Sequence, residues 1–201
     1  KRELFGARDH FGIKPFYYAK MNGTFMYASE IKSLLRHPDF VKELNAEALK
    51  PYMTFQYPAI GETFFKGVYK LPEGHYFTYR DGKMDIHRYY DEDFREGKQK
   101  LGELVNSIDQ TVCDSVKAHQ IADVEVGSFL SSGVDSSYVA AVARPQHTYS
   151  IGFGKGTYNE SQQAGELAEL LKLNNTAESL TDEEAFAAFP PIQWHLDEPD
   201  S

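Results

Sequence analysis

The feature that most constrains the fold of this chain is a run of small and polar residues at 131–137, with the sequence Ser-Ser-Gly-Val-Asp-Ser-Ser. The apolar residues 124–130 before it read as a buried strand, and residues 137–143 after it read as a helix. Such a turn lies against the free N–H groups and the positive dipole end of the helix. The sequence therefore predicts a phosphate-binding loop. A flexible connector or a serine-rich N-cap without a ligand is the alternative.

The side chains of this run suit a nucleotide phosphate. Gly133 allows close approach of the backbone, and the serine hydroxyls are hydrogen-bond donors. Asp135 offers a hard oxygen ligand for a Mg²⁺ ion bound to the same phosphates. Because no lysine lies in the run, the balancing positive charge must come from elsewhere in the fold.

Charge and cysteine content exclude several classes of function. The 201 residues carry a formal net charge of −9 and show no basic stripe, which argues against a nucleic-acid partner. The single cysteine, Cys113, excludes a disulfide within the chain and a multi-thiolate metal site, and is typical of a reducing, cytoplasmic location. No apolar run is long enough to span a membrane, so no membrane partner is expected.

Residues 1–95 are expected to be rich in β-structure. Asn22-Gly23 and Asp81-Gly82 each lie between aromatic-rich runs, a pattern typical of β-hairpins. Short helices are expected at 29–36 and 45–53, with Ser29 and Asn45 as their N-caps. The most polar segment, residues 91–100, is the expected linker.

The hydrophobic pattern changes after the linker. A stripe with helical spacing begins at Leu101, and Cys113 lies beside it as a packed thiol. Strands and helices then alternate, which predicts a parallel, doubly wound sheet whose ligands bind beyond the carboxyl ends of the strands. The expected segments are strands at 124–130, 148–153 and 176–180, helices ending at 143 and 173, and a helix opened by a capping box at 181–184.

The loop at 131–137 resembles the S-G-G-x-D-S motif of the PP-loop ATP pyrophosphatases, with Ser132 where the commoner pattern has glycine. Residues 8–18 and 27–35 look like the back half of a class II glutaminase domain, and residues 71–76 resemble its exit segment. In this order, the two halves are similar to the glutamine-hydrolysing asparagine synthetases of the B type.

This resemblance implies two incomplete domains. Residues 1–95 would be the C-terminal part of an N-terminal-nucleophile glutaminase, an αββα sandwich, and residues 96–201 the N-terminal part of a doubly wound, nucleotide-binding synthetase domain. The implied reaction is the ATP-dependent amidation of aspartate with glutamine-derived ammonia, through a β-aspartyl adenylate, with release of AMP and pyrophosphate. The implied small-molecule partners are aspartate, glutamine and ATP, with Mg²⁺ as cofactor; a homodimer is one option.

The resemblance also implies roles for individual residues. Asp9 would receive the α-ammonium of glutamine, and Asp135 and Asp197 would bind the metal. From the residues alone, Asp9 reads equally as a turn residue paired with Arg8, Ile151 as part of a buried core strand, and Asp197 with Glu198 as a solvated turn. The implied contacts with ATP and pyrophosphate are Leu130, Ser131, Ser132, Gly133, Asp135, Ser136, Ser137 and Ile151.

The family's nucleophile, an amino-terminal cysteine, has no counterpart at Lys1, so no catalytic residue is assigned and the chain is interpreted as an internal fragment that is inactive alone. Lys14, Glu30 and Lys32 are expected to shape the surface of the first half or its contact with the second. Two rival readings remain at this point: a related synthetase that acts on another carboxylate, of the β-lactam-forming type, and a non-catalytic nucleotide-binding module.

Overall fold

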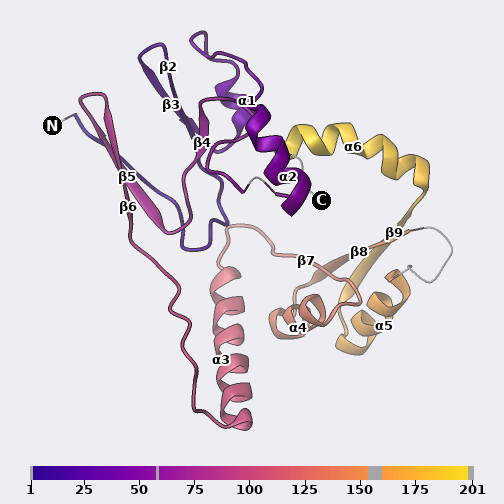
Figure 1. The fold of residues 1–201 in the computed structure, drawn as a ribbon. Coiled ribbons are helices and arrows are strands. Elements are labelled where there is room, and N and C mark those ends of the chain that lie inside the picture. The colour runs from indigo at the N-terminus through magenta and orange to yellow at the C-terminus, as the bar shows by residue number, and fades with distance from the viewer. Residues whose placement is uncertain (1, 58, 154–159, 199–201) are drawn as a thin grey trace. The chain divides into compact units, whose positions relative to one another are not determined.

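The computed structural model describes residues 2–57, 59–153 and 160–198 (Figure 1). The chain separates into two compact units, one formed by residues 1–95 with 190–201 and the other by residues 96–189. Each unit contains both helices and sheets, so the expected mixture of α and β structure is confirmed. The division into domains at 95/96 stays a prediction about function, because the two units are defined by compactness alone.

The first unit contains two three-stranded antiparallel sheets, with strand orders β1-β5-β6 and β3-β2-β4. Both predicted hairpins are confirmed, as β2 pairs with β3 and β5 with β6. Both turns have positive φ at their two central residues, 49° and 83° at Asn22-Gly23 and 51° and 77° at Asp81-Gly82. The strands are β1 (Leu4–Ala7), β2 (Tyr17–Met21), β3 (Thr24–Ala28), β4 (Val68–Lys70), β5 (His75–Arg80) and β6 (Lys83–Arg88).

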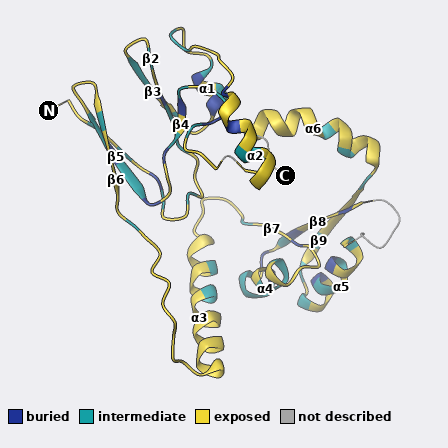
Figure 2. Ribbon diagram, in the orientation of Figure 1, coloured by how far each residue is buried: buried dark blue, intermediate teal, exposed yellow. Residues whose placement is uncertain are grey.

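The core of this unit lies between the β3-β2-β4 sheet and the helix α1 (Ile31–Leu34). Figure 2 shows the buried residues gathered around α1 and β4. Alternate residues of β2 point into this core, as the period of two in a strand requires. The buried residues of the cluster are Tyr17, Ala19, Met26, Ile31, Leu34 and Val68.

The two predicted helix caps in this unit have different outcomes. The Asn45 side chain accepts a hydrogen bond of 3.2 Å from the Glu47 N–H and begins η1 (Ala46–Ala48), which leads into α2 (Leu49–Phe55), so this cap is confirmed. The Ser29 cap is wrong, because α1 begins two residues later with Glu30 at the N-cap position and no cap from that side chain. A carboxylate distant in sequence takes the cap's place, as described below.

The second unit contains the predicted alternation of strands and helices, with a parallel sheet of order β7-β8-β9. The first strand is shorter than predicted over 124–130, because only Ser128–Phe129 pairs with β8. The Thr181 capping box is confirmed by reciprocal hydrogen bonds between Thr181 and Glu184. The elements are α3 (Leu101–His119), β7 (Ser128–Phe129), α4 (Val134–Ala143), β8 (His147–Phe153), α5 (Ser161–Leu171), β9 (Asn174–Leu180) and α6 (Asp182–Leu196), the last ending in the first unit.

Strand β8 has one buried and one exposed face among the described residues. Thr148, Ser150 and Gly152 are buried, whereas Tyr149, Ile151 and Phe153 remain about half exposed. Small residues of α4 and α5 pack with Leu130 in the buried cluster of this unit, which allows close approach of the helices. The interpretation of this segment as a buried core strand therefore holds for one face of β8 only, and the Ile151 side chain lies on the exposed face. No helix in the described part of the chain is long and apolar enough to span a membrane.

Candidate functional site

The loop at 131–137 starts from a residue that is fixed to the sheet. The Leu130 N–H donates to the Tyr149 carbonyl at 2.8 Å, and the Leu130 carbonyl accepts from the Ser150 hydroxyl at 2.8 Å. Leu130 itself is buried. These contacts bring Leu130, which directly follows β7, beside the segment of β8 that contains Ile151, so two residues predicted to contact ATP lie close together.

Serine hydroxyls hold the loop in its shape. The hydroxyls of Ser131 and Ser136 are 2.8 Å apart, and the Ser136 hydroxyl also lies 3.2 Å from the carbonyls of Ser131 and Gly133. The Gly133 N–H donates to the Ser131 hydroxyl at 3.2 Å. A Cβ at position 133 would lie 3.2 Å from that hydroxyl, so glycine leaves room for the network. The loop therefore folds back on itself at the start of α4, whose first turn contains Ser136.

The N-terminus of α4 is open to an anion. Gly133 is its N-cap residue and supplies no capping side chain, and Ser132 and Asp135 are exposed. The N–H groups of the first helical turn have no partner within the helix, and they add to the positive end of the helix dipole. A strand end, a glycine and an uncapped helix start thus form the arrangement that binds phosphate groups in proteins.

Asp135 is the predicted metal ligand that lies at this helix start. Among the described residues, no group of three or more His, Cys, Asp or Glu side chains could hold a metal ion on its own. A single carboxylate fits Mg²⁺, which commonly takes its remaining ligands from substrate phosphates and water. Asp197 lies in the first unit, where other donors engage its carboxylate, and the described contacts do not join it to Asp135.

Asp9, the predicted glutamine contact, organises the loop that follows β1. Its carboxylate accepts hydrogen bonds from the N–H groups of Lys14 at 2.9 Å, Ile13 at 2.9 Å and Phe11 at 3.3 Å. These bonds, led by that from Lys14, lower the pKa of Asp9 below its ordinary value. A carboxylate has about four lone-pair sites, so an acceptor position remains for a further donor such as an ammonium.

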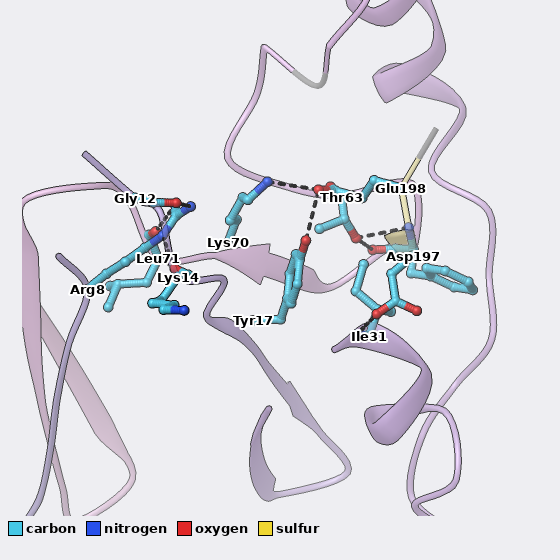
Figure 3. A network of polar contacts seen from close by, with 11 residues as sticks. Arg8, Gly12, Lys14, Tyr17, Ile31, Thr63, Lys70, Leu71, Asp197 and Glu198 are labelled. Carbon is cyan, nitrogen blue, oxygen red and sulfur yellow. Dashed lines mark hydrogen bonds and ion pairs between the residues drawn. The ribbon is translucent and has the colours of Figure 1, made fainter. Parts of the chain in front are cut away.

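Arg8 holds the same loop from the inside, a role that the sequence did not reveal. Its buried guanidinium donates to the carbonyls of Gly12 at 2.6 Å, Leu71 at 2.8 Å and Lys14 at 2.9 Å (Figure 3). Arg8 therefore does not pair with Asp9, as the turn interpretation supposed. Gly12 has φ of 66°, and a Cβ there would lie 2.7 Å from the guanidinium, so this position requires glycine. The sequence sign of the Arg8 role was therefore a glycine four residues after the arginine, in the pattern R-D-x-x-G.

Aromatic residues after β6 close the loop from outside. The Tyr89 hydroxyl donates to the Arg8 carbonyl at 2.7 Å, and the ring of His10 stacks on Tyr90 with centroids 4.1 Å apart. The N–H of Gly74, in the predicted exit segment, donates to the Asp9 carbonyl at 2.9 Å. Asp9 is thus partly exposed and held by contacts from several parts of the unit.

Comparison with known proteins matches two parts of the chain to two different families. The glutamine amidotransferase domain family matches residues 1–90, and the asparagine synthase family matches residues 107–201. The glutamine-hydrolysing asparagine synthetase 1 of Bacillus subtilis is 38% identical over 201 residues, which cover 98% of this chain and 32% of that protein. A putative glutamine-hydrolysing asparagine synthetase of Mycobacterium tuberculosis is 36% identical over 215 residues, with the same coverage of 98% and 32%.

A third relative, the glutamine-hydrolysing asparagine synthetase 3 of B. subtilis, is 32% identical over 162 residues, which cover 75% of this chain and 26% of that protein. The chain thus spans about a third of the length of the first two of these curated relatives. The family matches fall on the Asp9 loop and on the 131–137 loop respectively. Residues 1–90 are therefore similar to the glutamine amidotransferase domain family, and residues 107–201 are similar to the asparagine synthase family.

Proposed function

We propose that this chain is part of an enzyme that uses ATP and glutamine-derived ammonia to convert aspartate into asparagine. The observation that carries the proposal is the serine-held loop at 131–137, with the uncapped N-terminus of α4 and Asp135, in the same chain as the Asp9 loop. The names of the relatives, glutamine-hydrolysing asparagine synthetases, support the same reaction.

In this proposal the second unit binds ATP. The N–H groups at the start of α4 and the hydroxyls of Ser131, Ser136 and Ser137 hold the β- and γ-phosphates, and Ser132 lines the same loop through its backbone. Leu130 and Ile151 lie against the nucleoside. A Mg²⁺ ion held by Asp135 would neutralise phosphate charge. Asp197 as a second metal ligand stays a prediction, and its engaged carboxylate suggests another role, considered below.

The proposed chemistry has two steps at this site. The side-chain carboxylate of aspartate attacks the α-phosphorus of ATP; an O–P bond forms, and the bond to the bridging oxygen breaks to release pyrophosphate. Ammonia then attacks the acyl carbon of the β-aspartyl adenylate, AMP leaves, and asparagine forms. The α4 N–H groups favour the first step because negative charge grows on the departing pyrophosphate.

The first unit contributes to glutamine binding in the same proposal. Asp9 accepts the α-ammonium of glutamine through its remaining acceptor position, while Arg8 and the backbone donors keep its carboxylate in place. The nucleophile that attacks the glutamine amide is not assigned to any residue of this chain.

The test is Asp135→Ala in the full-length protein, with pyrophosphate and glutamate release measured side by side. We expect pyrophosphate release to be abolished and glutamate release to stay largely intact, because the phosphate charge that Asp135 helps to balance exists only at the ATP site. Asp182→Ala, an equally exposed acidic residue in the first turn of α6, is the control and should change neither.

Three outcomes would contradict the proposal. Equal loss of both activities in Asp135→Ala would show that this residue holds the fold together. Pyrophosphate release by the unmodified protein with a carboxylate other than aspartate would assign another acceptor. Binding of ATP without any turnover would favour a non-catalytic nucleotide-binding module.

A further inference from the structure

The chain returns to the first unit within α6, and its described part ends in two acidic residues with buried side chains. The side chains of Asp197 and Glu198 are only 6% and 11% exposed. Burying two carboxylates is costly unless each has hydrogen-bond donors or opposite charges nearby. The solvated turn expected from the sequence is therefore wrong, and the partners of the two residues define their role.

Asp197 provides the cap that α1 lacks locally. Its Oδ2 accepts the N–H of Ile31 at 2.7 Å (Figure 3). Its Oδ1 accepts hydrogen bonds from the N–H and the Nζ of Lys32 at 3.3 Å and 3.2 Å. Lys32 Nζ also donates to the His195 carbonyl at 3.3 Å and lies 3.3 Å from Glu30. One carboxylate thus satisfies two free backbone donors of the helix start and a largely buried ammonium.

Glu198 joins two neighbouring strands of the β3-β2-β4 sheet. Its Oε2 accepts the Tyr17 hydroxyl of β2 at 2.9 Å and the Lys70 ammonium of β4 at 2.8 Å. Burial and the charge of Glu198 raise the pKa of Tyr17, so its hydroxyl stays protonated and remains a donor. The other oxygen, Oε1, is buried and has no hydrogen-bond partner among the described residues.

These partners suit an anchor better than a metal ligand. The lone pairs of Asp197 already face three N–H groups, and the ammonium groups of Lys32 and Lys70 lie within 3.2 Å of the two carboxylates. A divalent cation at this place would be repelled by both ammonium groups and would have to displace established donors. The uncapped local start of α1 shows in turn that this helix depends on Asp197.

We infer that Asp197 and Glu198 are anchoring residues that fasten segment 190–198 to α1, β2 and β4. The two residues belong by sequence to the asparagine synthase region, and their partners belong to the glutamine amidotransferase region. The contact surface therefore joins sequence from both families within one compact unit. In this contact surface, Lys32, Tyr17 and Lys70 have a structural role that is separate from the proposed glutamine chemistry.

The first test is hydrogen exchange of the Ile31 and Lys32 amides in the full-length protein. Asp197→Ala should speed their exchange about fivefold or more, as expected for a lost helix cap, and Asp197→Asn should have a smaller effect. Exchange in the β5-β6 hairpin should not change, and Asp182→Ala should leave all of these amides unaffected. Unchanged exchange of Ile31 and Lys32 in Asp197→Ala would overturn the inference.

The second test reverses the Glu198 ion pair. Lys70→Glu should speed exchange in residues 190–198, and adding Glu198→Lys should restore most of the protection. The control is Lys66→Glu, which breaks an ion pair with Glu43 in which the lysine side chain is 60% exposed and the glutamate side chain 56% exposed. This variant should leave exchange in residues 190–198 unchanged. A double variant no better protected than Lys70→Glu alone would show that the pair does not anchor the segment.

A third measurement separates the anchor from a metal site. Glu198→Gln should leave the concentration of MgATP needed for half-maximal pyrophosphate release within about twofold of normal, a comparison that rests on the proposed function. A rise of tenfold or more, with exchange at Ile31 unchanged, would assign the acidic pair to the nucleotide and overturn the anchor. Because both exchange tests need no activity, failure of the proposed function would leave them valid.

Discussion

At the scale of single residues, the roles of several charged side chains depend on hydrogen bonds to backbone groups, and the pattern of residue types along the sequence does not show these bonds. Asp9 follows the rule that aspartate at a turn accepts nearby N–H groups, so its turn role could be predicted from local sequence. Arg8 donates only to carbonyls, and any residue type supplies a carbonyl, so its partners leave no trace in the sequence. Asp197 caps a helix 166 residues away, which local spacing cannot predict.

The three hydrogen bonds of the Arg8 guanidinium give a prediction about stability. Arg8→Lys keeps the charge but cannot reach three carbonyls in one plane, so at least one buried carbonyl loses its donor. We expect a loss of about 2 kcal/mol in the free energy of unfolding of the first unit, measured by urea denaturation, together with weaker glutamine binding. Arg36→Lys, at an exposed position, is the control. Equal stability of the two variants would refute the structural role of the Arg8 guanidinium.

The Asp9 carboxylate gives a prediction about pH. Because backbone donors favour its ionised form, its pKa in the folded protein lies below the ordinary value of 3.8. The contribution of these bonds to loop stability is therefore complete above about pH 4 and is lost as the pH falls through the folded pKa. A ¹³C NMR titration of Asp9 should show a midpoint below 3.8; a midpoint above that value would contradict the bonding described here.

At the scale of elements, the strand, loop and helix around Gly133 could be predicted because each has its own local signal. The apolar run, the small residues and the helical spacing predict the strand, the turn and the helix in the observed order, but α4 begins at Val134, three residues before the predicted helix at 137–143. The length of β7 could not be predicted, since strand ends depend on pairing with β8 rather than on the strand's own residues. Hairpins with Asn-Gly and Asp-Gly turns were predictable because those dipeptides favour positive φ.

Two serines of the loop should respond differently to substitution. The Ser132 side chain is exposed and has no hydrogen bond within the described loop, so Ser132→Gly in the full-length protein should bind ATP at least as well as the original. Ser136→Ala removes the hydroxyl that joins Ser131 to Gly133 and should weaken ATP binding about tenfold. Calorimetric titration with MgATP checks both. A marked loss in Ser132→Gly would mean that its hydroxyl is itself a contact.

At the scale of the whole molecule, the sequence predicted a β-rich part followed by a part in which strands and helices alternate. This order could be predicted because the hydrophobic periodicity of the first part differs from that of the second. The return of residues 190–198 to the first unit was not predictable in the same way. Pro190 and Pro191 lie in α6 where the chain passes from one unit to the other, but helical spacing continues across them. Long-range contacts, among them those of Asp197 and Glu198, fix where this segment lies.

The central claim is that glutamine and ATP are handled by separate parts of the molecule, with Asp9 serving glutamine alone. The most direct test is Asp9→Ala in the full-length protein, assayed for asparagine formation with glutamine and with ammonium as the nitrogen source. Loss of a charge-assisted contact should raise the glutamine concentration needed for half-maximal rate by roughly tenfold or more. With ammonium, in a parent enzyme that accepts it, the variant should work at close to the normal rate. Loss of both activities in a variant that remains folded by circular dichroism would contradict the claim, because Asp9 would then be needed for the ATP-dependent chemistry itself.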